Sequence, residues 1–111
     1  MVTYEILSEP GEREYNEDYA GAKQHGEDWC FVLADGLGGH GGGDEASRMV
    51  SEYILNDFEK CGEVSEGYLK KCFEESQKLL MEEQERQGRA FEMKTTLVAL
   101  LVSHSTVWWG H

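Results

Sequence analysis

Proline, basic residues and long apolar runs are all scarce in this 111-residue chain. Pro10 is the only proline, and 10 basic residues stand against 22 acidic ones, for a formal net charge of -12. So acidic a surface argues against a nucleic-acid binder, which needs a basic face. The longest apolar runs, such as Leu97 to Val102, have the length of a strand and fall far short of the roughly 20 residues of a membrane helix. The first residues also lack the features of a signal peptide, so we expect a cytoplasmic protein without nucleic-acid or membrane partners.

Cysteine is scarce as well, and its spacing excludes two familiar uses. The three cysteines are odd in number and form no Cys-x-x-Cys pair: Cys30, Cys61 and Cys72. This pattern supports neither a disulfide framework nor a paired-cysteine metal site. We expect three buried free thiols in a reducing compartment, none of them a nucleophile.

Apolar spacing predicts strands separated by two long helices. Strands are expected over 2–7, 19–24, 29–34, 94–102 and 106–109, and helices from 44 to about 61 and from about 65 to 87. Strands, then helices, then strands indicate an α+β fold with antiparallel pairing. Because residues 29–34 are continuously apolar, we expect that strand to be covered on both faces.

The candidate chemistry lies in two polar segments. Asp35 follows an apolar strand and opens a segment, 36–43, in which every residue but Leu37 and His40 is glycine. Glu17 and Asp18 supply two further carboxylates from a predicted loop. Carboxylate and main-chain carbonyl oxygens are the ligands that Mg²⁺ and Mn²⁺ prefer, and three converging carboxylates require a cation or raised pKa values.

The residues alone leave simpler interpretations open. Glu17 and Asp18 fit a solvated loop, and Asp35 fits a turn or a helix cap. Arg13 could hold phosphate oxygens with its planar guanidinium.

Gly36-x-Gly38-x-x-Gly41 also matches a dinucleotide-binding fingerprint, but a second helix follows where a βαβ unit requires a strand.

The order and spacing of four motifs resemble the PPM/PP2C family of serine/threonine phosphatases, most of all its bacterial branch. The motifs are Arg13-Glu14-Tyr15-Asn16-Glu17-Asp18, Leu33-Ala34-Asp35-Gly36-Leu37-Gly38-Gly39-His40, Glu45-Ala46-Ser47 and Met93-Lys94-Thr95-Thr96-Leu97-Val98-Ala99. The resemblance implies a four-layer αββα sandwich with antiparallel sheets and two Mn²⁺ or Mg²⁺ ions between them. It implies hydrolysis of phosphoserine and phosphothreonine in phosphoprotein substrates by metal-activated water.

The resemblance also assigns roles to single residues. It makes Asp35 a bridging metal ligand and the Gly36 carbonyl a second one. Glu17 would ligate a metal directly or through water, Asp18 would act on metal-bound water, and Arg13 would bind the substrate phosphate. Here Lys94 stands where the family usually has glycine.

The family domain is about twice as long and continues with further metal-ligating aspartates. We therefore expect residues 1–111 to be the N-terminal part of one PPM-type domain, incomplete at its C-terminus and weakly active or inactive alone. The alternative is a non-catalytic fragment that pairs with a partner through an exposed sheet edge at 106–111.

Overall fold

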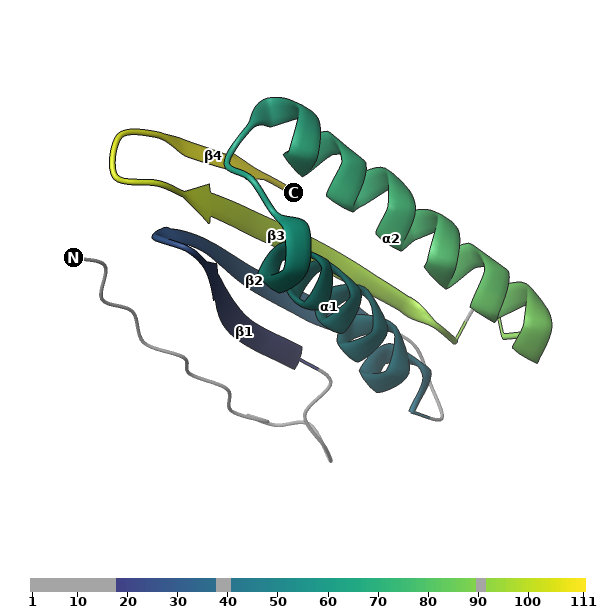
Figure 1. Ribbon diagram of the computed structural model, residues 1–111. Coiled ribbons are helices and arrows are strands. Elements are labelled where there is room, and N and C mark those ends of the chain that lie inside the picture. Colours follow the sequence, from purple (N-terminus) through teal and green to yellow (C-terminus); the bar gives the residue numbers. More distant parts are fainter. Residues whose placement is uncertain (1–17, 38–40, 90–91) are drawn as a thin grey trace.

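The structure, a computed structural model, describes residues 18–37, 41–89 and 92–111 (Figure 1). Its elements are β1 (Asp18–His25), β2 (Asp28–Leu37), α1 (Gly42–Cys61), α2 (Glu66–Gln87), β3 (Lys94–Val102) and β4 (Val107–Gly110). The predicted elements within these ranges are confirmed, with ends that differ by at most three residues. The strand expected over 2–7 lies outside the described residues.

The described strands form one antiparallel sheet in the order β1-β2-β3-β4. Gly26 lies in the tight turn between β1 and β2 with φ 63, a left-handed conformation that favours glycine. Both helices are inserted between β2 and β3, which nevertheless pair side by side. The predicted α+β class with antiparallel pairing is therefore confirmed for this part of the chain.

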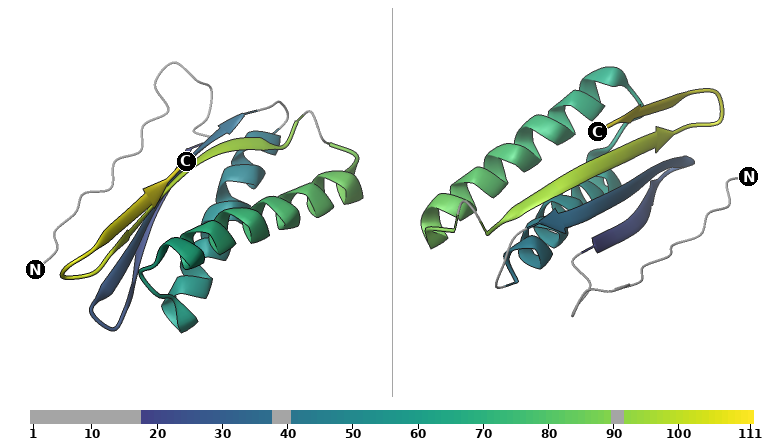
Figure 2. Two further views of the ribbon diagram at one scale, coloured as in Figure 1. Left: turned by 90° about the horizontal axis from the view of Figure 1, so that it is seen from above. Right: turned by 180° about the vertical axis from the view of Figure 1, so that it is seen from behind.

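Both helices lie on one face of the sheet (Figure 2). Helix α1 packs on β1, β2 and β3, whereas α2 packs on α1 and β4. The core between helices and sheet includes the fully buried side chains of Ile54, Phe58 and Leu101. Helix α2 begins after Ser65, whose hydroxyl accepts a hydrogen bond from the Tyr68 main-chain N–H at 3.1 Å. A serine cap does not require a glutamate three residues later. The sequence lacks that capping-box signal, although the cap forms.

The opposite face of the sheet is open in the described part of the chain. Along β2 the burial alternates, and Leu33 is 51% and Leu37 45% exposed. The prediction that this strand is covered on both faces is therefore wrong for the described residues, where helices cover one face only. The expectation for the thiols also fails at one position, because Cys61 is exposed at the end of α1 while Cys30 and Cys72 are buried.

Candidate functional site

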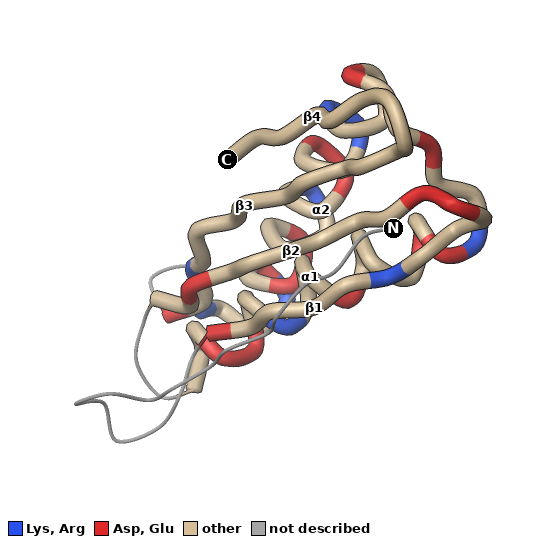
Figure 3. Tube along the Cα trace, turned by 90° about the vertical axis from the view of Figure 1, so that its left-hand side faces the viewer, with Lys and Arg blue, Asp and Glu red and all other residues tan. Residues whose placement is uncertain are grey.

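Two of the predicted carboxylates lie directly opposite each other. Asp18 is the first residue of β1, not a loop residue as expected, and the β1–β2 register pairs it with Asp35. Because a strand alternates its side chains, facing residues of an antiparallel pair share one face. Both residues are half-buried, and they lie on the face that the helices leave open. The acidic positions near these strand ends lie together at one end of the sheet (Figure 3).

Asp35 lies inside a strand, two residues before its end. Strand β2 continues through Gly36 to Leu37, and the N-cap of α1 is Gly41. Asp35 is therefore neither a turn residue nor a helix cap, which were the simpler interpretations of the sequence. Gly36 is buried and lies opposite Thr95 of β3. The remaining predicted site residues, Arg13 and Glu17, lie outside the described residues, as do 38–40 of the glycine segment.

The dinucleotide interpretation is contradicted by the topology. The strands before and after the glycine segment and its helices, β2 and β3, are antiparallel neighbours. A dinucleotide-binding βαβ unit requires parallel strands. The glycine segment therefore serves a different architecture.

Two threonines of β3 contact Asp35, which the sequence alone does not indicate. Thr95 Oγ1 donates to the Asp35 carbonyl at 3.1 Å, and the Asp35 main-chain N–H donates to Thr96 Oγ1 at 3.3 Å. The Thr95-Thr96 pair lies in one of the four motifs that resemble the PPM/PP2C family. That motif is the signal by which the sequence could have indicated the two threonines. Their contact with Asp35 depends on the β2–β3 register, which no local pattern reveals.

An ion-pair cluster ties the start of α1 to the segment before β3. The Arg89 guanidinium donates to Glu45 Oε1 at 2.9 Å and to Glu92 Oε2 at 3.2 Å. Arg89 has only 19% of its side chain exposed, and Gln87 Nε2 adds a hydrogen bond to Glu45 at 3.2 Å. The bonds from Arg89 and Gln87 lower the pKa of the Glu45 carboxyl. This cluster fixes the helix that follows the glycine segment.

The lowered pKa of Glu45 predicts a pH-dependent contribution to stability. A carboxyl whose pKa is lower in the folded state stabilises the fold above its unfolded value of about 4.3 and loses that contribution as the pH falls through the folded pKa. We expect Glu45→Gln to reduce the free energy of unfolding by about 0.5 kcal/mol at pH 7, as for partly exposed ion pairs. The deficit should shrink in urea-unfolding curves as the pH is lowered below about 4. Glu52→Gln, on the exposed side of α1, is the control, and a deficit of Glu45→Gln that persists at low pH would contradict this account.

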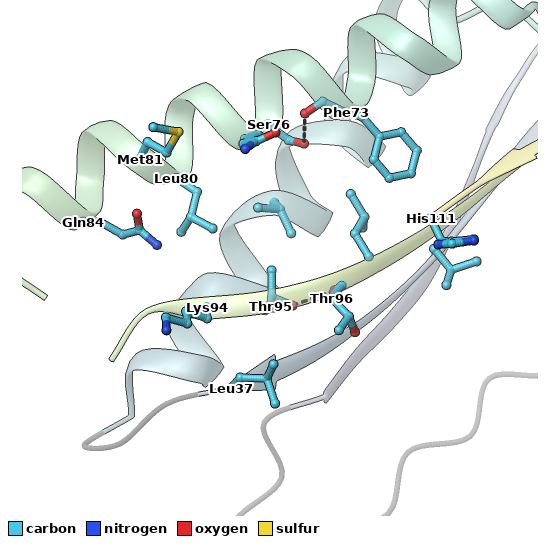
Figure 4. A pocket seen from close by; sticks show the side chains of 14 residues that line it. Leu37, Phe73, Ser76, Leu80, Met81, Gln84, Lys94, Thr95, Thr96 and His111 are labelled. Atoms are coloured by element: carbon cyan, nitrogen blue, oxygen red, sulfur yellow. Dashed lines mark hydrogen bonds between the residues drawn. The ribbon is translucent and has the colours of Figure 1, made fainter. Parts of the chain in front are cut away.

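A groove of about 850 Å³ lies between β3 and the part of α2 from Phe73 to Gln84 (Figure 4). Phe73, Leu80 and Met81 of α2 face Leu97 of β3 across it, and His111 lies at its end. The groove occurs where β4 no longer accompanies β3, since β4 pairs only with Ala99–Val102. This part of the β3 edge therefore has no strand beside it among the described residues.

The donor atoms at the acidic end suit a hard divalent cation. Two facing carboxylates repel each other, and a divalent ion between them removes that cost. Among the described residues, no group of three or more His, Cys, Asp or Glu side chains could hold a metal. The oxygen atoms that this end of the sheet could offer to such an ion are the carboxylates of Asp18 and Asp35 and the Gly36 carbonyl. Neither helix of the described ranges is long and apolar enough to cross a membrane.

Comparison with known proteins identifies the family of this chain. The sequence model of protein phosphatase 2C matches residues 10–111. The chain therefore belongs to the protein phosphatase 2C family. The serine/threonine phosphatase Stp from Listeria monocytogenes is 32% identical over an alignment of 101 positions, and the match covers 86% of this chain and 40% of that relative.

Solved structures show the same arrangement. The serine/threonine phosphatase Stp1 from Staphylococcus aureus matches with a TM-score of 0.78 at 26% identity, over 88% of this chain and 41% of that one. The S. agalactiae serine/threonine phosphatase matches in fold with a TM-score of 0.72 at 20% identity, over 96% of this chain and 45% of that one. This chain thus spans about 40% of the length of the curated relatives that it matches.

Proposed function

We propose that residues 1–111 are the N-terminal part of a metal-dependent phosphatase domain that hydrolyses phosphoserine and phosphothreonine in proteins of the cytoplasm. The observation that carries this proposal is the direct pairing of Asp18 with Asp35 across β1 and β2. Two carboxylates at directly paired positions of the sheet concentrate negative charge, which a divalent cation would offset. Because the chain belongs to the protein phosphatase 2C family, we assign this acidic pair to the hydrolysis of phosphoserine and phosphothreonine.

Each site residue then has a role. Asp35, the Gly36 carbonyl and Glu17 would hold Mn²⁺ or Mg²⁺, and Asp18 would orient water beside them through its carboxylate. Arg13 would bind the phosphate of the substrate with its guanidinium. When bound, the divalent cations would lower the pKa of water and offset negative charge on the phosphate.

The open sheet face supports the larger αββα architecture. Its side chains are apolar over most of the sheet, with Leu33, Val98 and Val107 at least 41% exposed and Trp109 65% exposed. An apolar face of this extent is typical of a sheet that packs on another layer. A second sheet packed there would bring its own ligands to the end that carries Asp18 and Asp35. Without those ligands, we expect residues 1–111 to bind metal weakly and to turn over little or no substrate.

A chimera tests whether this chain can complete a phosphatase site. Residues 1–111 would replace the matching segment of the Staphylococcus aureus phosphatase, and hydrolysis of a phosphothreonine peptide would be measured with Mn²⁺. We expect Mn²⁺-dependent hydrolysis by the chimera, none by its Asp35→Ala variant, and none by residues 1–111 alone. A folded chimera without activity, or robust activity of residues 1–111 alone, would overturn the proposal.

The incompletely paired β3 edge favours a second candidate, a non-catalytic chain that binds a partner strand. Strand β3 pairs with β2 along its full length, but β4 pairs only with Ala99–Val102, so among the described residues no strand lies beside the outer edge of β3 at Lys94–Val98, next to the groove. Unpaired main-chain groups on such an edge can pair with another chain. Size-exclusion chromatography of the purified chain discriminates here, because a stable monomer over a wide concentration range counts against this candidate.

A further inference from the structure

Thr95 and Thr96 hold the main chain of Asp35 by their side-chain hydroxyls. Thr95 Oγ1 lies 3.1 Å from the Asp35 carbonyl and 2.7 Å from the Thr96 carbonyl, and its one proton is shared between these two acceptors. Thr96 Oγ1 accepts from the Asp35 N–H at 3.3 Å and lies 3.5 Å from the same carbonyl. These contacts join residues 60 and 61 positions apart in the sequence, so they depend entirely on the β2–β3 pairing.

The two hydroxyls approach Asp35 from opposite faces of the sheet. Side chains alternate along β3, and Ala99 and Leu101, which share the face of Thr95, are buried under the helices. Thr96 lies on the open face, directly opposite Asp35. The Asp35 peptide groups are thus held from the core side by one hydroxyl and from the open side by the other.

The two threonine hydroxyls contact the main chain of Asp35, the residue whose carboxylate would bind the metal. Asp35 has Asp18 opposite it on β1 and Thr96 opposite it on β3. A rotation of the Asp35 peptide would move its carboxylate and the adjoining Gly36 carbonyl together. Partners that orient metal ligands, without touching the metal, change metal affinity by about 10- to 100-fold when they are removed.

We propose that Thr95 and Thr96 are positioning residues that fix the Asp35 carboxylate and the Gly36 carbonyl for a divalent cation. The inference rests on the proposed metal-binding function of Asp35. It adds two β3 residues that touch neither the metal nor the substrate. The hydroxyls of the two threonines, rather than their bulk, carry the effect. Valine separates the two, because it has nearly the shape of threonine but lacks the hydrogen-bonding group.

Mn²⁺ binding by residues 1–111 tests the inference through paramagnetic broadening of amide signals, which also detects weak binding. We expect Thr95→Val/Thr96→Val to weaken binding by about tenfold or more. The serine double variant, which keeps both hydroxyls, should bind within about twofold of the wild-type chain. Thr106→Val, in the turn before β4, is the control and should bind unchanged. Circular dichroism establishes that each variant is folded; if the double variant unfolds, the single variant at exposed Thr96 replaces it.

The outcomes separate this inference from the proposed function. Wild-type affinity in the valine variants, with affinity lost in Asp35→Ala, would overturn the role of the threonines and leave the metal site standing. Unchanged affinity in Asp35→Ala would overturn the metal site itself. Equal losses in the serine and valine variants would also overturn the inference, because they would show that the hydroxyls do not carry the effect.

Discussion

Replacing Asp35 with asparagine is expected to stabilise the metal-free chain while removing its affinity for divalent cations. Asp35 faces Asp18 across the strand pair, and like charges directly opposite each other destabilise a sheet by about 0.2–1 kcal/mol. Asp35→Asn removes that repulsion, so the free energy of unfolding in EDTA should rise by about 0.5 kcal/mol. The same substitution removes a ligand charge, so Mn²⁺ affinity should fall by more than about tenfold. Urea unfolding in EDTA and in excess Mn²⁺ measures both effects.

The opposite signs of the two effects distinguish a metal site from a structural carboxylate. Asp28→Asn is the matched control, because Asp28 begins the same strand and faces His25 at the other end of the hairpin. It should leave the Mn²⁺-induced stabilisation intact. Equal Mn²⁺-induced stabilisation of the wild type and Asp35→Asn would contradict the assignment, as would a destabilised Asp35→Asn variant in EDTA.

Gly42→Ala is expected to destabilise the fold more than any other conservative change considered. A Cβ atom at Gly42 would lie 1.7 Å from the Glu92 carbonyl oxygen and 2.4 Å from its carbon. These are main-chain atoms, so the start of α1 and the segment before β3 must move apart. Overpacking of this kind costs about 3 kcal/mol, which corresponds to a fall in Tm of about ten degrees or more.

Gly67→Ala provides the control within the same class of substitution. Gly67 is in the first turn of α2, and an added Cβ meets nothing within 4 Å. Alanine should therefore raise the free energy of unfolding by up to about 1 kcal/mol through its helix propensity. Thermal unfolding of both variants checks the pair. A Gly42→Ala variant as stable as the wild type would show that α1 does not approach Glu92 this closely.

Local patterns predicted the elements of the fold but not the exposure of its faces. Apolar spacing identified both helices, and the β-rich run from Lys94 predicted β3 with the bounds that the structure has. The run from Trp29 to Ala34 was misinterpreted because a continuous apolar sequence does not say what covers each face. In the structure, the helices cover the face of Cys30, Val32 and Ala34, and none of the described elements covers the other face.

The candidate site was predictable in part. The motif order indicated Asp18 and Asp35, but their direct pairing requires the strand register, which depends on how the whole hairpin packs. The contacts of Thr95 and Thr96 with Asp35 and of Arg89 with Glu45 join residues 44 to 61 positions apart. No local spacing encodes such contacts. The roles of Arg13 and Glu17, which lie outside the described residues, stay predictions.

The central claim is that the end of the sheet carrying Asp18 and Asp35 is a divalent-cation site. Titration of the ¹⁵N-labelled chain with Mn²⁺ tests it most directly, because broadening falls off steeply with distance from the ion. The account predicts that the amide signals of Asp18, Asp35 and Gly36 disappear first, at Mn²⁺ concentrations that leave the outer acidic residues of α2 unaffected. Broadening that begins at Glu74, Glu82 and Glu85 of α2, or that spreads evenly over all acidic residues, would contradict it.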